Sequence, residues 1–132
     1  MSNREDVNIW PSVTADDALA LRAWLVALGF REGICVPGER AGQVVHSEMY
    51  WPEGGRLMVA SRSGKDDDTF EVPRGAMSCY VVTKDPDAVW ARAKDLDARV
   101  IRDVEDTDYG SRGFSIADTE GNTYSFGSYA GS

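Results

Sequence analysis

The chain has 132 residues with a formal net charge of −8, 42% hydrophobic and 27% charged residues, which suits one compact domain or two small modules that share a core. The negative charge argues against nucleic acid and anionic membranes as partners, because both require clustered Lys and Arg. The chain contains no apolar run of transmembrane length and starts with the polar stretch MSNREDVN, so we expect no signal peptide and a cytoplasmic location.

The first half of the chain predicts the element order β-α-β-β-β. Asp16 and Asp17 supply an N-cap for a helix, and Gly29 ends it. Apolar residues within this helix follow the spacing i, i+3, i+4, i+7 of a helix packed on a sheet: Leu21, Trp24, Leu25 and Leu28. The expected elements are a flexible arm at 1–7, a strand at 9–14, the helix at 18–28, and strands at 30–36, 43–50 and 56–61.

A polar stretch at 62–75 follows, and we interpret it as a linker between two modules. Its acidic run, Asp66–Asp68, lacks the alternating ligand spacing and the closing Glu of a calcium-binding loop. A solvated linker is therefore the better interpretation. Cys35 and Cys79 are too few for a disulfide framework or a zinc cluster, and we expect both to be small packing residues.

The second half repeats the order of the first. Asp85 caps a helix whose first position is Pro86, and the expected elements are a strand at 77–82, the helix at 87–96, and strands at 100–104, 112–117 and 123–126. Asp17 and Asp85 are 68 residues apart, and Gly55 and Gly121 are 66 apart. Two β-α-β-β-β modules, at 8–61 and 76–129, therefore indicate a duplicated unit.

The last hairpin carries the most specific motif, Tyr109-Gly-x-Arg112-x-Phe114-x-x-x-Asp118-x-x-Gly121-Asn-x-x-x-Phe126. It resembles the final hairpin of the vicinal oxygen chelate superfamily, which holds glyoxalases, bleomycin-resistance proteins and extradiol dioxygenases. Thr119 stands where that superfamily usually has Pro. The stretch Trp51-Pro-x-Gly-Gly-x-Leu-Met-x-x-Ser61, after His46-x-Glu48, is similar to the bleomycin-resistance and glyoxalase-like branch.

This resemblance implies an α+β fold in which the two modules form a concave mixed sheet with the helices on its convex face. It also implies a ligand cleft on the concave side and a homodimer. The metal-dependent members place one ligand on the first strand and one on the last strand of each module. Carried over to this chain, those places are Trp10, Val59, Ser78 and Ser125. None is a usual ligand of a divalent metal, so we expect no metal and no other cofactor.

His46 is the only histidine, and with Glu48 it forms a His-x-Glu pair on one face of a strand. As a metal site the pair supplies two ligands and the sequence offers no third. As an acid/base pair it is conceivable, because imidazole titrates near neutral pH. A partly exposed His with a local hydrogen bond or a dimer contact is the plainer interpretation.

Other candidate ligand contacts are aromatic or hydrogen-bonding. If the four metal positions face the cleft, the alternation of side chains along a strand directs further residues toward the cleft as well. These residues either contact a flat organic ligand or only fill a collapsed barrel. They are Trp10, Ser12, Tyr80, Thr123 and Ser125. Trp51 is a candidate for the cleft rim or a dimer contact, and Tyr109 for a lid. Arg112 either clamps a ligand carboxylate or pairs with a neighbouring acid.

Three functions remain open. The first is a metal-free protein that sequesters a small aromatic or amphipathic compound, such as an antibiotic, and an acidic protein suits a cationic one. The second is a glyoxalase-like lyase or isomerase that uses His46 and Glu48. The third is an interaction module whose cleft holds no ligand.

Overall fold

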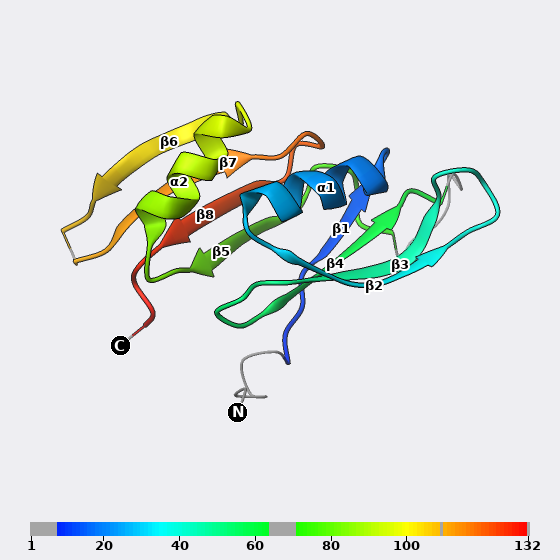
Figure 1. Ribbon diagram of the computed structural model, residues 1–132, viewed down its shortest axis with the longest axis horizontal. Helices are drawn as coiled ribbons and strands as arrows, with labels where there is room; N and C mark the ends of the chain where they lie inside the picture. The colour runs from blue at the N-terminus through cyan, green and yellow to red at the C-terminus, as the bar shows by residue number, and fades with distance from the viewer. Residues whose placement is uncertain (1–7, 64–70, 109, 132) are drawn as a thin grey trace.

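The computed structural model describes residues 8–63, 71–108 and 110–131, and they form two successive β-α-β-β-β modules (Figure 1). The first module contains β1 (Ser12–Ala15), α1 (Ala18–Leu28), β2 (Arg31–Pro37), β3 (Val44–Tyr50) and β4 (Arg56–Ser61). The second contains β5 (Ser78–Val82), α2 (Pro86–Asp95), β6 (Arg99–Asp106), β7 (Arg112–Ala117) and β8 (Thr123–Gly127). The expected arm at 1–7 and the acidic run Asp66–Asp68 lie outside the described residues. This order of elements confirms the predicted α+β fold.

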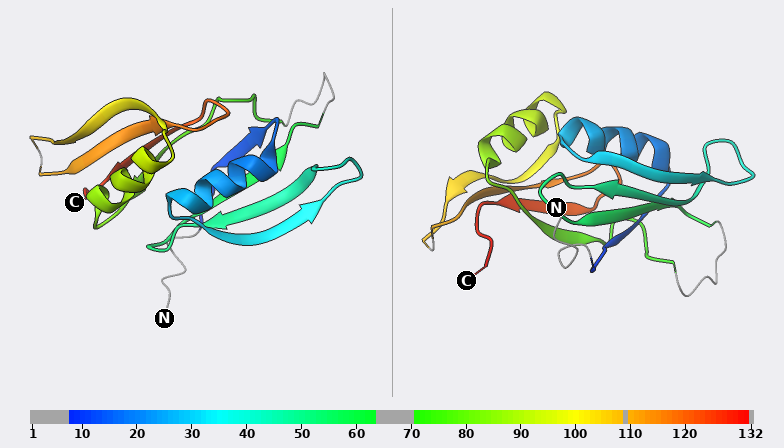
Figure 2. Two further views of the ribbon diagram at one scale, coloured as in Figure 1. Left: turned by 45° about the horizontal axis from the view of Figure 1, so that its top comes forward. Right: turned by 60° about the horizontal axis from the view of Figure 1, so that its bottom comes forward.

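Each module has its own four-stranded mixed sheet, in the order β1-β4-β3-β2 and β5-β8-β7-β6. The first and last strands of each module pair in parallel, and the remaining pairs are antiparallel. Helices α1 and α2 contact each other on the same side of the sheets (Figure 2). We call the opposite side the open face, and it carries Trp10, Ser12, Tyr50, Met58, Tyr80 and Ser125.

The two helices form where the sequence predicts them. The Asp17 carboxylate accepts a hydrogen bond from the amide of Ala20, and the Asp85 carboxylate accepts one from the amide of Ala88. Each cap satisfies an amide that has no partner within the helix. The apolar stripe of α1 packs on the sheet, and its four residues are buried. Gly29 ends α1 at a φ of 131°, a conformation that favours glycine.

The first strand begins later than expected, at Ser12 instead of residue 9. Pro11 has no N–H to donate to a neighbouring strand. Its carbonyl still accepts a hydrogen bond from the amide of Met58, but pairing in register starts one residue later, where Ser12 lies opposite Met58.

The core lies between the sheets and the helices and is rich in aromatic rings. Phe114 and Phe126 stack at a centroid distance of 5.3 Å, and Phe114 also meets the edge of Trp90 at 5.0 Å. Trp24 on α1 lies 5.9 Å from Tyr124 on β8, so the first helix packs against the second module. Among the described residues, no helix has the length and apolar character required to cross a membrane.

Candidate functional site

A cavity of about 560 Å³ lies where the two modules meet, and we call it the junction cavity. Its walls come from the segment before β1, the turn between β3 and β4, and strand β5 with the residues after it. Most of its lining is apolar or aromatic, including Phe30, Trp51, Leu57, Tyr80 and Val82. The charged residues that line it are Glu53, Arg56 and Lys84. The cavity therefore combines a broad apolar surface with a few charged groups.

Trp51 lies inside the molecule and not at a rim. Only 7% of its surface is exposed, and its ring packs 4.9 Å from Phe30 and 5.5 Å from Phe126. Its indole N–H donates to the carbonyl of Val82 at 2.9 Å. Trp51 thus joins the two modules and also forms part of the wall of the junction cavity.

Tyr80 and Ser125 lie opposite each other on β5 and β8, on the open face. Tyr80 is 49% exposed, and its hydroxyl donates to the carbonyl of Tyr129 at 2.6 Å. The hydroxyl of Ser125 lies 2.7 Å from that of Ser115. Of these two predicted ligand contacts, only Tyr80 lines the junction cavity.

A second cavity, of about 310 Å³, lies on the open face of the first module. Ser12, Thr14, His46 and Met58 contribute to its lining. The structure thus places Ser12 and His46 at one cavity and Trp51 and Tyr80 at another. The predicted ligand contacts do not converge on a single site within the described chain.

A row of three polar side chains, His46, Glu48 and Arg56, extends from the second cavity to the junction cavity. The Nε2 atom of His46 lies 2.8 Å from one carboxylate oxygen of Glu48, and Arg56 donates from Nη1 to the other at 2.9 Å. These hydrogen bonds, the one with His46 first, outweigh burial and hold the pKa of Glu48 below its usual value. Glu48 is therefore an ion-pair partner held by two groups.

Arg56 is a site residue that sequence analysis missed. Its guanidinium carbon lies 4.5 Å from the ring centres of both Trp10 and Tyr50, so two aromatic faces hold it by cation–π contact. Tyr50 and Arg56 are cross-strand partners on β3 and β4. Their positions on either side of the turn at 51–55 were the available signal, but the contact with Trp10 depends on the folded sheet.

Arg112 binds an acid of its own module. It contacts both carboxylate oxygens of Asp87 at 3.0 and 3.1 Å, and Asp106 at 3.4 Å. Asp87 raises the pKa of Arg112. This geometry matches the pairing alternative from the sequence. The other candidate from that loop, Tyr109, lies outside the described residues.

Val59 does not occupy the last-strand ligand position that the sequence assigned to it in the first module, because its side chain is fully buried in the core. In the last turn of each module, Gly54 donates to the carbonyl of Trp51 as Gly121 donates to that of Asp118. Gly54 is therefore the counterpart of Gly121, whereas the sequence comparison paired Gly121 with Gly55. Equivalent residues of β4 and β8 therefore differ by 67 in number, and the residue of β4 that corresponds to Ser125 on the open face is Met58.

The metal chemistry of the superfamily does not fit these residues. The four places are Trp10 and Met58 in the first module and Ser78 and Ser125 in the second, and none carries an imidazole or carboxylate. Ser12 and Tyr80, which pair with Met58 and Ser125 across the sheets, do not carry one either. Within residues 8–63, 71–108 and 110–131, no three His, Cys, Asp or Glu side chains are grouped to hold a metal ion.

Comparison with known proteins identifies the fold. No family model and no curated protein matches the sequence. The crystal structure of TioX from Micromonospora sp. ML1 matches with a TM-score of 0.75 at 22% identity, over 90% of this chain and 95% of TioX. A glyoxalase/bleomycin resistance protein from Streptomyces sp. CB03234 matches with a TM-score of 0.70 at 20% identity, over 89% of this chain and 96% of that one.

A bleomycin-binding protein, solved in complex with bleomycin, has a TM-score of 0.65 at 14% identity, over 92% of this chain and 98% of that one. At such identities the likeness establishes the fold alone. The chain therefore shares the fold of these glyoxalase/bleomycin resistance proteins, as the resemblance of the sequence implied.

Proposed function

We propose that the protein binds and sequesters a small aromatic or amphipathic compound without converting it. The junction cavity carries this proposal, because its volume of about 560 Å³ falls in the range of ligand pockets, roughly 300–1,000 Å³. Its walls of Phe30, Trp51 and Tyr80 suit contact with a flat apolar molecule. The bleomycin complex of a protein with the same fold supports binding of an organic compound, and an antibiotic belongs to the same class.

The cavity also separates this proposal from that of an interaction module without a ligand. Such a module would fill its cleft with its own side chains. Here the described side chains leave a volume of about 560 Å³ between the modules, which favours ligand binding.

The neutral fluorescent probe phenylnaphthylamine tests the proposal. We expect saturable binding, with about one probe per chain, that Val82→Asp weakens by about tenfold or more because a carboxylate then faces the apolar wall. Val100→Asp is the matched control, because Val100 is 37% exposed, Val82 is 39% exposed, and only Val82 lines the cavity. No saturable binding, or equal weakening by both variants, would contradict the proposal.

A lyase or isomerase is the second candidate, and the hydrogen bond between His46 and Glu48 is the observation that favours it. Turnover in a glyoxalase assay that disappears in both His46→Ala and Glu48→Ala would replace the sequestration proposal. Mass spectrometry of the protein after dialysis against nickel, zinc or manganese tests the expected absence of a resident metal. A stoichiometric ion would move the protein to the enzyme class.

We also propose that the protein is a homodimer that buries part of the open face. Trp10, Val36, Tyr80 and Val82 are each between 37% and 49% exposed, which is unusual for apolar residues gathered on one side of a monomer. Light scattering on the purified protein should give twice the mass of the chain, and Val36→Asp should shift it toward the monomer. A monomer at all accessible concentrations would refute the dimer and leave the binding proposal intact.

A further inference from the structure

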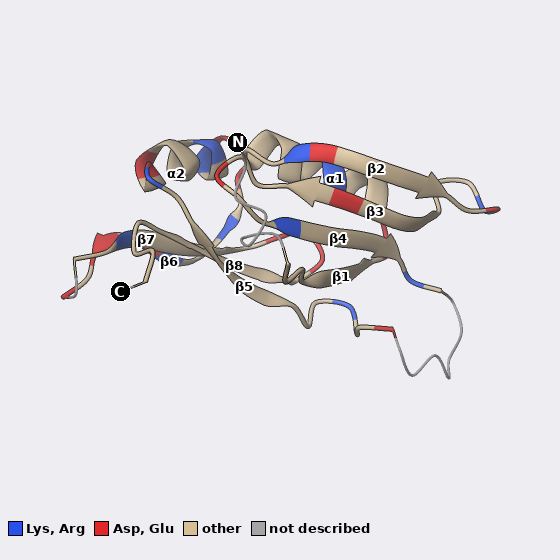
Figure 3. Cartoon of the chain, turned by 90° about the horizontal axis from the view of Figure 1, so that it is seen from below, with Lys and Arg blue, Asp and Glu red and all other residues tan. Residues whose placement is uncertain are grey.

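Arg56 occupies an unusual position in the middle of the molecule. Strands β1, β5 and β8 contain no charged residue, and β4 contains only Arg56 (Figure 3). Its guanidinium is stacked between Trp10 and Tyr50. Stacking fixes the plane of a guanidinium and leaves its edges for hydrogen bonds. The fold therefore fixes the guanidinium of Arg56, with Glu48 as its ion-pair partner, at the wall of the junction cavity.

The hydrogen bonds of Arg56 are incomplete. A guanidinium has five N–H groups, and Glu48 accepts from Nη1. The Nε atom is buried, and no described residue provides an acceptor for it. A buried donor without an acceptor is unfavourable. Because Nε is enclosed, an anion in the cavity would reach the guanidinium through its terminal nitrogens, Nη1 and Nη2, which can bind a carboxylate, sulfonate or phosphate through two parallel hydrogen bonds.

The charges of the other residues that line the cavity are compatible with a bound anion. Lys84 is a second cation of its lining. Glu53 is the one acid among the residues that line it, and its carboxylate already accepts from the amide of Lys84 at 2.8 Å. The protein has a net charge of −8, so the presence of two cations, Arg56 and Lys84, at one cavity differs from its overall negative charge. The remaining wall is largely apolar, and a flat ring system can rest on it while an anionic group faces Arg56.

We infer that the ligand of the junction cavity is a planar aromatic compound with an anionic group, such as an aryl carboxylate or sulfonate, and that Arg56 binds the anion. This inference rests on the proposed binding function and specifies the class of ligand. It differs from the cationic ligand that the overall charge suggests, because the local charge at the cavity decides which group is bound.

Two fluorescent probes that share one ring system test the inference: anilinonaphthalene sulfonate, which carries an anion, and neutral phenylnaphthylamine. The wild-type protein should bind the sulfonate about tenfold more tightly, as expected for a charge-assisted hydrogen bond. Arg56→Gln should remove this difference by weakening the sulfonate alone. Arg99→Gln, an exposed arginine on β6 outside the cavity, should leave both affinities within about twofold.

Arg56→Lys is the second variant, because it keeps the charge but loses the two-point edge, and it should retain part of the preference. Circular dichroism confirms that each variant is folded. Equal wild-type affinities for the two probes, or sulfonate binding that survives Arg56→Gln or Val82→Asp, would overturn the inference. Binding of both probes without preference would still support the proposed function, whereas no binding of either probe would defeat it.

Discussion

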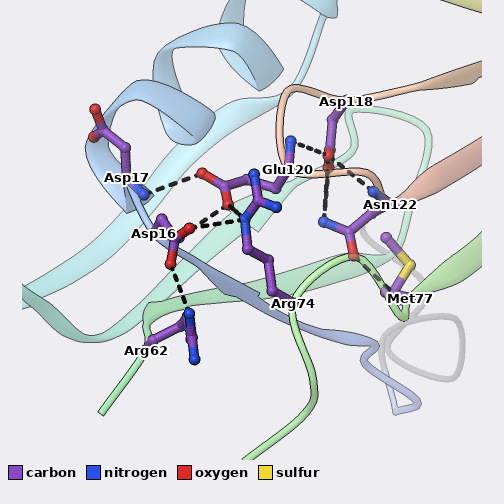
Figure 4. Close-up of polar contacts among 8 residues, drawn as sticks. All are labelled: Asp16, Asp17, Arg62, Arg74, Met77, Asp118, Glu120 and Asn122. Atoms are coloured by element: carbon purple, nitrogen blue, oxygen red, sulfur yellow. Dashed lines mark hydrogen bonds and ion pairs between the residues drawn. The ribbon is translucent and has the colours of Figure 1, made fainter. Parts of the chain in front are cut away.

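The carboxylate of Glu120 accepts a hydrogen bond from the backbone amide of Asp17 at 3.0 Å, and so joins the last turn of the second module to the first helix of the first module (Figure 4). Its other oxygen accepts from the amide of Asp16 at 2.9 Å and from Arg74 at 2.6 Å. A carboxylate at a helix N-terminus satisfies free amides and interacts favourably with the helix dipole. Glu120 thus caps a helix that is distant from it in the sequence.

The reverse contact exists at the other end of the junction. Glu53, in the last turn of the first module, accepts from the amide of Lys84, which precedes α2, at 2.8 Å. Each module therefore contributes a glutamate, from the same position of its last turn, that binds the segment leading into the helix of the other module. The two contacts differ in burial, because Glu120 is 6% exposed and Glu53 is exposed. This difference provides a natural pair of test and control residues.

We expect Glu120→Ala to lower the free energy of unfolding by about 2–3 kcal/mol, because it leaves two partly buried backbone amides without their acceptor and removes one of the two carboxylates that hold Arg74. Glu53→Ala removes a single exposed hydrogen bond and should cost less than about 1 kcal/mol. Urea denaturation followed by circular dichroism measures both values. Equal losses for the two variants would show that burial of the Glu120 contact is unimportant.

Glu120 also predicts how stability depends on pH. Burial raises its pKa, but hydrogen bonds from Asp16, Asp17 and Arg74 outweigh this effect and leave the pKa below its ordinary value of 4.5. The stabilisation is therefore fully present above that value and is lost as the pH falls through the lower pKa of the folded state.

Urea midpoints measured from neutral pH down to about pH 3 should decrease less steeply for Glu120→Gln than for the wild type. Glu53→Gln is the control for the general loss of a carboxylate. Identical slopes for Glu120→Gln and the wild type would contradict the predicted pKa.

The hydrogen bond from Trp51 to Val82 should contribute less than the packing of the Trp51 ring. Trp51→Phe keeps an aromatic ring between Phe30 and Phe126 and loses the N–H donor, so we expect a cost of about 1 kcal/mol. Trp51→Ala also leaves a cavity, and should cost about 3–5 kcal/mol. Thermal denaturation of the two variants compares the contribution of the hydrogen bond with that of ring packing. Similar losses of stability in Trp51→Phe and Trp51→Ala would show that the hydrogen bond dominates.

The sequence predicted the helices and most strands because their signals are local. Asp17 and Asp85 are caps, and the stripe that includes Leu21 and Leu25 has the period of a helix. The repeat of the modules also followed from the sequence. Its register was wrong by one residue at β4, since two adjacent glycines, Gly54 and Gly55, were both candidates for the counterpart of Gly121.

The sites were harder to predict, because they depend on contacts between distant segments. Arg56 acquires its role from Trp10, which approaches it only when β1 pairs with β4. Glu120 looked like a turn residue, and its contact with α1 exists only after the modules have docked. Neither contact leaves a periodic or spacing signal in one sequence.

The two cysteines should differ strongly in reactivity. Burial first, and Asp118 second, raise the pKa of Cys79 to about 11 from 9.0, whereas Cys35 is exposed on β2. Because the thiolate is the reactive form, this shift alone slows Cys79 by about a hundredfold. Ellman's reagent should modify one thiol rapidly, and Cys35→Ser but not Cys79→Ser should abolish that phase. A fast phase that persists in Cys35→Ser would contradict the burial of Cys79.

Arg112 can be tested for two roles, that of a structural ion-pair partner of Asp87 and that of a contact of the ligand's anionic group. It is 38% exposed and its partner Asp87 is 59% exposed, so a double-mutant cycle of Arg112→Ala and Asp87→Ala should give a coupling below about 1 kcal/mol. Because Arg112 does not line the junction cavity, Arg112→Ala should leave the affinity for anilinonaphthalene sulfonate within about twofold, while Arg56→Gln weakens it about tenfold. Loss of binding in Arg112→Ala equal to that in Arg56→Gln would instead make Arg112 a contact of the anion, and would place the bound ligand nearer to β7 than to β4.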